Sequence, residues 1–271
     1  MKDLDCIQFL RWSLPKLRMR WQGFRKVRSQ VCKRIDRRLR ELGLPDVGAY
    51  RSYLKDNPDE WRIFDSFCRI TISHFYRDRE VFRFIEREVL TKLSEEATAR
   101  GEKELRCWSI GCASGEEPYT LALIWNMAAG LFFTSLKIAI LATDVDRSMI
   151  ERAEEGCYAS SSLKDLPPQW TASAFVCQED RFCIRAEERE KVVFLVQDIR
   201  RTAPDGLFHV ILCRNLVFTY FNEKLRKEVL ARMRDKLYSG GALVLGIHET
   251  LPAGSSGFGP WPGSPGVYRK K

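Results

Sequence analysis

The chain has 271 residues, of which 45% are hydrophobic and 30% charged, enough to build one large domain or a small domain joined to a larger one. This composition excludes a disordered chain and a collagen-like fibre. No apolar run approaches the roughly 18 to 20 residues that a membrane-spanning helix needs, and the first residues carry acids where a signal peptide carries basic residues. We therefore expect a soluble, cytoplasmic protein without membrane insertion.

The cysteines and histidines argue against a disulfide framework and against a zinc site. The nine cysteines are odd in number and contain no CxxC pair. Only three histidines are present, and no His/Cys cluster has the close spacing of metal ligands. We expect no metal site, and we expect most of the cysteines to be small core residues.

The positive charge is concentrated near the N-terminus. The net charge is +9, whereas residues 11–40 hold twelve Lys or Arg and one acid, a local charge of +11 that leaves −2 for the rest of the chain. Residues 25–42 place apolar side chains at helical spacing between arginines, and Gly43 and Pro45 provide a stop. This segment is predicted to be an amphipathic basic helix, whose field would attract an acidic partner, either a nucleic acid or an acidic protein surface.

The hydrophobic pattern changes along the chain. Helical patterns, broken at Asn57-Pro58, fade into a polar stretch near residues 95–103, so we expect an all-α domain over residues 1–90. From Leu105 onward, short β-rich runs alternate with helical patterns, which predicts an α/β domain with a mostly parallel sheet over residues 91–271. The strands are expected at 105–111, 136–144, 191–198, 207–213, 242–248 and 267–269, with helices at 116–130 and 222–241.

A loop of small residues, Gly111 to Gly115, joins an expected strand to an expected helix that Pro118 opens. Small residues let a ligand approach the backbone, and a helix N-terminus presents unpaired N–H groups. No lysine follows Gly115 as a phosphate-binding loop requires, and Glu116 and Glu117 at its mouth would repel phosphate. Such a loop can also be an ordinary strand–helix turn, but its acidic mouth suits a positively charged ligand.

The next expected strand ends at Asp144, where doubly wound folds place a carboxylate that holds ribose hydroxyls. Taken together, the loop, its acidic mouth and this acid favour a cationic ligand that carries adenosine. S-adenosylmethionine (SAM) has a sulfonium, an ammonium and a ribose, so it meets all three demands.

Several segments resemble one known family, the CheR-type methyltransferases that esterify glutamates of bacterial chemotaxis receptors. The likeness spans most of the chain and rests on RRLRELGL, TISHFYRD, WSIGCASGEEPYT, ATDVD, FHVILCRN and GGALVLGIHE, in that order. It implies a Rossmann-like SAM-binding methyltransferase domain joined to an all-α N-terminal domain. It also implies that SAM is converted to S-adenosylhomocysteine, and that an acidic helical protein meets the basic helix 25–42.

The resemblance also implies a set of site residues. Arg77 and Tyr220 are expected to act in catalysis, with Arg77 positioning the acceptor carboxylate and Tyr220 lining the path of the methyl group. Glu117 is expected at the methionine part of SAM, Asp144 at the ribose, and Asp198 at the adenine. The expected cofactor contacts are Thr71, Ser73, Arg77, Gly111, Cys112, Ala113, Gly115, Glu117, Asp144, Asp198, Ile199, Arg214 and Asn215.

The chain departs from the family pattern at several positions. Thr71 stands where the family has Asn, and Tyr76 stands where it has Phe. Tyr220 lies one residue later than the family's tyrosine, so Thr219 is an alternative occupant of that place. The antiparallel insertion near residues 174–196 is short and lacks a glycine-rich turn, so we do not expect it to tether receptor tails.

Three other functions remain open from the sequence. A methyltransferase for nucleic acid would use the basic segment, but that segment has few aromatic residues for stacking, and the Asn/Asp-Pro-Pro-Tyr motif of amino methylation is missing. A small-molecule methyltransferase on the same scaffold is a second alternative. The third is a module that binds SAM and presents the basic helix to a partner. Nothing in the sequence compels a dimer, so we expect a monomer.

Overall fold

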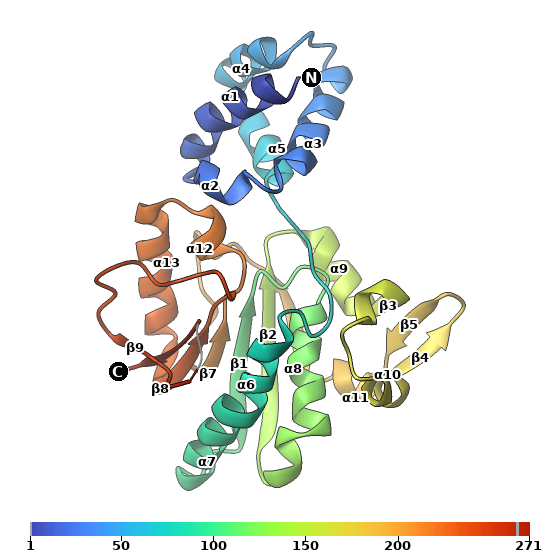
Figure 1. The fold of residues 1–271 in the computed structure, drawn as a ribbon, viewed down its shortest axis with the longest axis vertical. Coiled ribbons are helices and arrows are strands. Elements are labelled where there is room, and N and C mark those ends of the chain that lie inside the picture. The colour runs from blue at the N-terminus through green and yellow to red at the C-terminus, as the bar shows by residue number, and fades with distance from the viewer. Residues whose placement is uncertain (1, 264–265) are drawn as a thin grey trace. The chain divides into compact units, whose positions relative to one another are not determined.

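The computed structural model describes residues 2–263 and 266–271, which form two compact units (Figure 1). The first unit runs to Thr71 and also contains Leu216–Lys227, and the second consists of Ile72–Asn215 and Glu228–Lys271. This division differs from the single cut at residue 90 that we expected. The helices over residues 79–99 belong to the second unit because their apolar side chains lie in the same core as the first strand of its sheet.

The first unit is helical, as expected for the N-terminal domain. Phe9 stacks on Tyr50 with 5.6 Å between ring centroids and meets Phe64 edge-on at 5.4 Å. Asp46 begins one helix by accepting a hydrogen bond from the backbone N–H of Ala49 at 2.9 Å. The helices of this unit are α1 (Asp3–Ser13), η1 (Leu14–Leu17), α2 (Trp21–Phe24), α3 (Arg28–Glu41), α4 (Val47–Asp56), α5 (Glu60–Phe67) and α12 (Val217–Tyr220).

The basic segment forms α3, which is shorter than the expected helix 25–42. Its apolar residues Val31, Ile35 and Leu39 are buried, so its arginines and lysines occupy the remaining faces. Arg38 points inward and holds the buried carboxylate of Glu60 at 2.8 and 2.9 Å.

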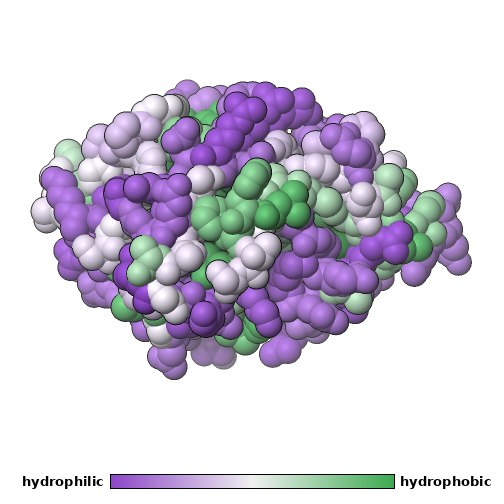
Figure 2. Space-filling view, turned by 90° about the horizontal axis from the view of Figure 1, so that it is seen from below, coloured by the Kyte–Doolittle hydropathy of each residue, from purple (hydrophilic) through white to green (hydrophobic). Residues whose placement is uncertain are grey.

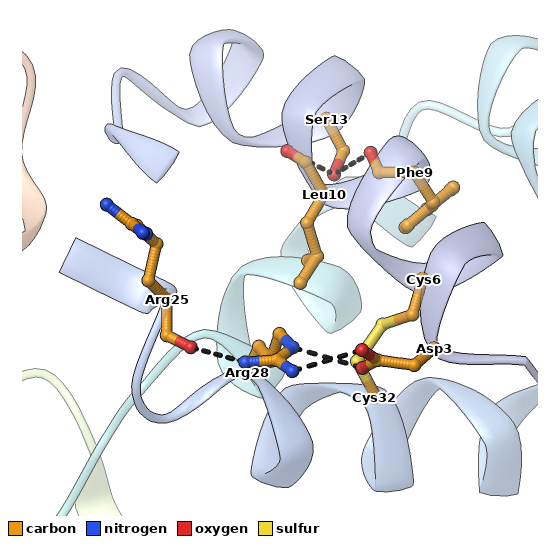
Figure 3. The surroundings of a disulfide bond; sticks show 8 residues. All are labelled: Asp3, Cys6, Phe9, Leu10, Ser13, Arg25, Arg28 and Cys32. Carbon is orange, nitrogen blue, oxygen red and sulfur yellow. Dashed lines mark hydrogen bonds and ion pairs between the residues drawn. A yellow bond between two sulfur atoms is a disulfide. The ribbon is translucent and has the colours of Figure 1, made fainter. Parts of the chain in front are cut away.

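A disulfide joins α1 to α3 through Cys6 and Cys32, whose Cα atoms are 6.0 Å apart (Figure 3). Beside it, Arg28 donates two hydrogen bonds to Asp3, each 3.0 Å long. A second disulfide links Cys157 and Cys183. Our expectation that the cysteines form no disulfide framework was therefore wrong for these four, because pairing depends on which elements the fold brings together. The other buried cysteines, Cys68, Cys107, Cys112 and Cys213, form no disulfide.

The second unit contains a mixed seven-stranded sheet in the order β6-β2-β1-β7-β8-β10-β9. The first five strands in that order pair in parallel, and β10 pairs antiparallel with β8 and β9. The mostly parallel, Rossmann-like architecture is confirmed. The strands are β1 (Glu104–Ile110), β2 (Lys137–Asp144), β6 (Val192–Val196), β7 (Phe208–Leu212), β8 (Leu237–Val244), β9 (Phe258–Pro260) and β10 (Val267–Lys270).

The second unit also contains helices, one of which is shorter than expected. The expected helix 222–241 ends early, since β8 begins at Leu237 and Gly240 has a φ of +81° within it. The helices that include residues of the second unit are α6 (Arg79–Phe84), η2 (Ile85–Leu90), α7 (Thr91–Ala99), α8 (Glu116–Met127), η3 (Ala129–Phe132), α9 (Arg147–Glu155), η4 (Ser160–Leu163), α10 (Pro168–Ala174), α11 (Ala186–Arg189) and α13 (Glu223–Asp235).

A small antiparallel sheet, β3-β5-β4, forms the insertion. Its strands are β3 (Cys157–Ala159), β4 (Phe175–Gln178) and β5 (Arg181–Ile184). The expected range 174–196 is therefore offset, because the insertion begins with β3 and residues 192–196 belong to the main sheet.

The surface is mainly hydrophilic on the face in Figure 2, where one hydrophobic area interrupts it near the centre. Within residues 2–263 and 266–271, no helix combines the length and the apolar character needed to cross a bilayer. The same described ranges contain no group of three or more His, Cys, Asp or Glu residues placed to hold a metal ion.

Candidate cofactor site

The carboxyl ends of β1, β2 and β6 meet at one edge of the parallel sheet, the place where open α/β sheets bind ligands. The backbone N–H of Gly111, after β1, donates to the carbonyl of Thr143 at 2.8 Å. The N–H of Gln197, after β6, donates to the carbonyl of Asp144, also at 2.8 Å. The loops that follow these three strands therefore lie side by side.

The loop from Gly111 to Gly115 has a backbone that small residues require. Ala113 and Gly115 have φ values of +47° and +91°. A Cβ on Gly115 would lie 2.9 Å from the Cβ of Ala153 and 3.1 Å from the hydroxyl of Tyr158, so any larger residue would both strain and crowd the turn. This turn places the loop directly before the N-terminus of α8.

Asp144 holds the loop in place from the end of β2. Its Oδ2 accepts the N–H of Ala113 and its Oδ1 accepts the N–H of Asp146, each at 2.9 Å. Asp198, after β6, accepts from the backbone N–H and the side chain of Arg200, both at 2.9 Å. Two carboxylates with fixed orientation therefore border the edge of the sheet.

Glu117 lies in the first turn of α8, and its side chain is 15% exposed. Its carboxylate accepts the hydroxyl of Ser109 at 2.8 Å and Nη1 of Arg214 at 3.0 Å. Burial raises the pKa of Glu117 above the ordinary value, and the charge of Arg214 opposes that rise.

Arg214 connects three segments around this carboxylate. Its side chain is 2% exposed, and its Nη2 donates to Asp78 at 2.6 Å and to the carbonyl of Arg77 at 2.8 Å. The guanidinium also lies 4.8 Å from the ring centroid of Phe82. The segment before α6, the start of α8 and the end of β7 are thus held by one buried cation.

Glu249, which was not among the residues expected from the sequence, fixes the turn after β7. Asn215 has a φ of +55°, and its N–H donates to Oε2 of Glu249 at 2.8 Å. The same oxygen accepts the N–H of Gly246 at 2.9 Å, and Glu249 is 5% exposed. The available signal was an acid shortly after the apolar run of β8, within a segment that carried the family resemblance.

The residues present fit SAM. Glu117 and Asp144 are suited to an ammonium and to ribose hydroxyls, and the loop Gly111–Gly115 carries only small residues, so a ligand can approach its backbone closely. In addition, Oε1 of Gln197 is buried and has no hydrogen-bond partner within the described residues. An orphaned acceptor beside Asp198 matches the exocyclic amine of adenine, a hydrogen-bond donor. Gln197 was not among the residues expected from the sequence.

The structure brings many but not all of the expected site residues together. The hydrogen bonds above join Arg77, Ala113, Glu117, Asp144 and Arg214 around the strand ends, and Gly111, Cys112, Gly115, Asp198, Ile199 and Asn215 lie in the loops that follow β1, β6 and β7. Ser73 belongs to the same unit.

Thr71, Thr219 and Tyr220 belong to the first unit. There, Tyr220 packs on Phe24 with 4.9 Å between ring centroids, and Arg20 donates to the carbonyl of Thr219 at 2.9 Å. The roles expected of these three residues at the cofactor site therefore stay predictions.

Comparison with known proteins identifies the family. Residues 71–264 match the model of the CheR methyltransferase SAM binding domain, and residues 26–64 match that of the CheR methyltransferase all-alpha domain. The chemotaxis protein methyltransferase of Salmonella typhimurium is 32% identical over 232 residues, which cover 83% of this chain and 76% of that protein. Its counterpart in Borreliella burgdorferi is 28% identical over 231 residues, covering 83% and 81%.

A longer relative also matches. An uncharacterized 104.1 kDa protein of Rhodobacter capsulatus is 32% identical over 224 residues, which cover 82% of this chain and 23% of that protein. The matches thus extend over both the helical and the cofactor-binding part of the sequence. The chain belongs to the CheR family of SAM-dependent methyltransferases.

Proposed function

We propose that this chain transfers the methyl group of SAM to a glutamate side chain of an acidic, helical protein of the chemoreceptor kind. The observation that carries the proposal is the presence, in one chain of this family, of an acid-lined strand edge and a basic helix on which several cations are exposed. The relatives named as chemotaxis protein methyltransferases support the choice of acceptor.

The surface of α3 suits an acidic partner. Lys33, Arg37 and Arg40 are exposed, and the ion pairs of the two arginines with Glu41 and Asp36 are long, at 3.6 and 3.7 Å. Exposed i,i+4 pairs of this kind contribute little stability, so an acidic protein can displace them at small cost. We propose that the acceptor meets this face of α3.

When bound, SAM supplies a methyl group on a positively charged sulfonium that is already activated toward a nucleophile. We propose that Asp144 holds the ribose hydroxyls, that Glu117 holds the ammonium, and that Asp198, Ile199 and Gln197 flank the adenine. The small-residue loop allows close approach to its backbone. We assign the remaining contacts to Thr71, Ser73, Gly111, Cys112, Ala113, Gly115, Arg214 and Asn215.

The acceptor needs positioning more than it needs a base. A glutamate with a pKa near about 4.3 is already anionic at neutral pH, so no group has to remove a proton. We propose that Arg77 orients this carboxylate and that Tyr220, or Thr219 in its place, lines the path of the methyl group. Holding the reactants in line supplies most of the rate enhancement that such a site needs.

The test is transfer from labelled SAM to an acidic helical receptor fragment, followed by mild alkali. A glutamate methyl ester is hydrolysed and releases its label, whereas a methylated nitrogen in protein or nucleic acid keeps it. Alkali-labile label in the protein is the expected result, and alkali-stable label would refute glutamate esterification.

Variants assign the roles within the site. Arg77→Ala should lower turnover strongly, while Arg79→Ala, which changes an exposed arginine two residues away, serves as the control. A comparison of Tyr220→Phe with Thr219→Ala decides which side chain lines the methyl path, since only the variant at that place should lower kcat.

We further propose that the chain acts in the cytoplasm as a monomer. The basic surface of α3 is suited to an acidic partner and not to a second copy of itself. Light scattering after size-exclusion chromatography measures the mass in solution, and cell fractionation measures the compartment. A stable dimer or a secreted product would contradict this part of the proposal.

A further inference from the structure

The first unit contains a hollow of about 500 Å³, within the range of ligand-binding cavities. It lies between α1, η1, α4 and the start of α5, and every residue around it belongs to the first unit. It is separate from the strand ends that form the cofactor site, which belong to the second unit. The lining residues are Trp12, Lys16, Leu54, Lys55, Pro58 and Trp61.

The walls of this hollow are apolar and fixed. The rings of Trp12 and Trp61 have centroids 5.7 Å apart at an angle of 45°. The indole N–H of Trp61 donates to the carbonyl of Leu54 at 2.9 Å, which satisfies its one polar group and holds the ring in place. Leu54 is buried, and Pro58 adds a rigid apolar side. Such walls suit a large aliphatic or aromatic side chain.

The rim of the hollow is cationic. The guanidinium of Arg51 lies 4.4 Å from the ring centroid of Trp12, and Nζ of Lys16 lies 5.2 Å from it. Lys55 is exposed on the hollow's edge. Across the described ranges, none of these three cations forms an ion pair with a carboxylate, whereas Arg28 and Arg38 in the same unit do. Their charge is therefore available to an anionic partner.

We propose that this hollow is a second docking point for the acidic acceptor protein, and that it takes one large apolar side chain flanked by carboxylates. The inference rests on the proposed function, because the occupant is a segment of the protein that is methylated. The apolar walls bury the side chain, and Lys16, Arg51 and Lys55 pair with the acids beside it. Docking here adds a contact that is separate from the basic face of α3.

A nucleic acid fits the hollow less well. Single-stranded nucleic acids bind by stacking bases on open aromatic faces. Arg51 already stacks on Trp12, and Trp12 packs against Trp61, so these contacts leave little open ring face on which a base could stack. A side chain that enters the hollow beside the two rings needs no open face.

The experiment compares the double variant Lys16→Glu/Lys55→Glu with Lys224→Glu, which reverses an exposed lysine elsewhere in the first unit. Methylation of the acidic receptor fragment is measured at low and high salt, SAM affinity by calorimetry, and folding by circular dichroism. At low salt the double variant should raise the KM for the acceptor by about tenfold, with an unchanged kcat and SAM affinity. High salt should reduce the difference, because exposed charges are screened.

A second variant tests the apolar wall without changing charge. Trp12→Leu should raise the KM for the acceptor at both salt concentrations, because burial of an apolar side chain is not screened by salt. Its circular dichroism spectrum controls for folding, since Trp12 also contacts Phe9.

The outcomes separate this inference from the proposed function. If the unchanged protein places no alkali-labile methyl on the acidic acceptor, the proposed function fails. If it does so and both hollow variants keep the KM of the control, only the docking inference fails. Competition by a single-stranded RNA that binds the unchanged protein but not the double variant would assign the hollow to nucleic acid and overturn the inference.

Discussion

Replacement of Arg214 by Met should destabilise the second unit through loss of one buried cation. Arg214 is 2% exposed and pairs with Asp78 at 2.6 Å and Glu117 at 3.0 Å, whose side chains are only 19% and 15% exposed. Breaking a buried pair by removing one partner costs about 3 to 5 kcal/mol, because the other charge is left without compensation. For a unit of this size, that loss lowers Tm by about 6 to 20 °C.

The pH dependence gives this prediction a second observable. Burial already raises the pKa of Glu117, and loss of Arg214 should raise that pKa further. As the pH falls, Glu117 in the variant takes up a proton and the uncompensated charge disappears. The difference in unfolding free energy between the variant and the unchanged protein should therefore be largest at high pH and shrink toward pH 5.

The assay is urea unfolding followed by circular dichroism at several pH values, with Arg181→Met as the matched control. Arg181 pairs with Glu155 at 2.6 Å, as short as the Arg214–Asp78 pair, but these two side chains are 48% and 49% exposed. The control should change stability little, because exposed ion pairs are weak. Equal losses in the two variants, or a loss at Arg214 that does not depend on pH, would refute the argument from burial.

Three further predictions concern single residues. Glu117→Gln should weaken SAM binding by about 10-fold to 150-fold, as expected for loss of a charge-assisted hydrogen bond. Because the pKa of Glu117 is raised, the unchanged protein should start to lose SAM affinity at a pH above 4.5, the ordinary pKa of a glutamate. Calorimetry from pH 5 to 8 measures both effects. Gly115→Ala should lower Tm by several degrees more than Gly101→Ala, since both have positive φ but only Gly115 is crowded. Burial lowers the pKa of His209 against the pull of Glu102, so the unfolded chain binds a proton below pH 6.5 that the folded chain resists, and stability should fall as the pH drops through 6.5. His209→Gln should flatten that slope in urea unfolding, and an unchanged slope would contradict this origin.

The α/β class of the main domain could be predicted because its signals are local. Apolar runs at β1, β2, β6 and β7 lie where strands were expected, and the glycine-bounded loop and Asp144 follow strands whose carboxyl ends the parallel topology brings together. The family resemblance then ordered these segments. The residues that form the acid-lined edge were accessible from sequence for that reason.

The parts that could not be predicted depend on contacts between distant segments. Cys6 pairs with Cys32 only because α1 packs on α3, and no spacing rule encodes that packing. Glu249 acts through Asn215, 34 residues earlier, after two strands have become neighbours. The prediction of a helix through residue 241 was wrong because the apolar pattern of α13 continues into β8. There, pairing with β7 makes the segment a strand.

The segment Leu216–Lys227 has a consequence for how the protein is made. The N–H of Arg20 donates to the carbonyl of Tyr220, Met19 bridges to Phe221, and a Cβ on Gly23 would lie 2.3 Å from the carbonyl oxygen of Thr219. These contacts mean that the first unit is completed by a piece of chain that leaves the ribosome long after the helices it contacts, since Thr219 follows Arg20 by 199 residues. The first unit therefore cannot complete its packing until most strands of the sheet have been synthesised. A gene fragment cut at codon 71 or 90 should yield a helical bundle with one side open.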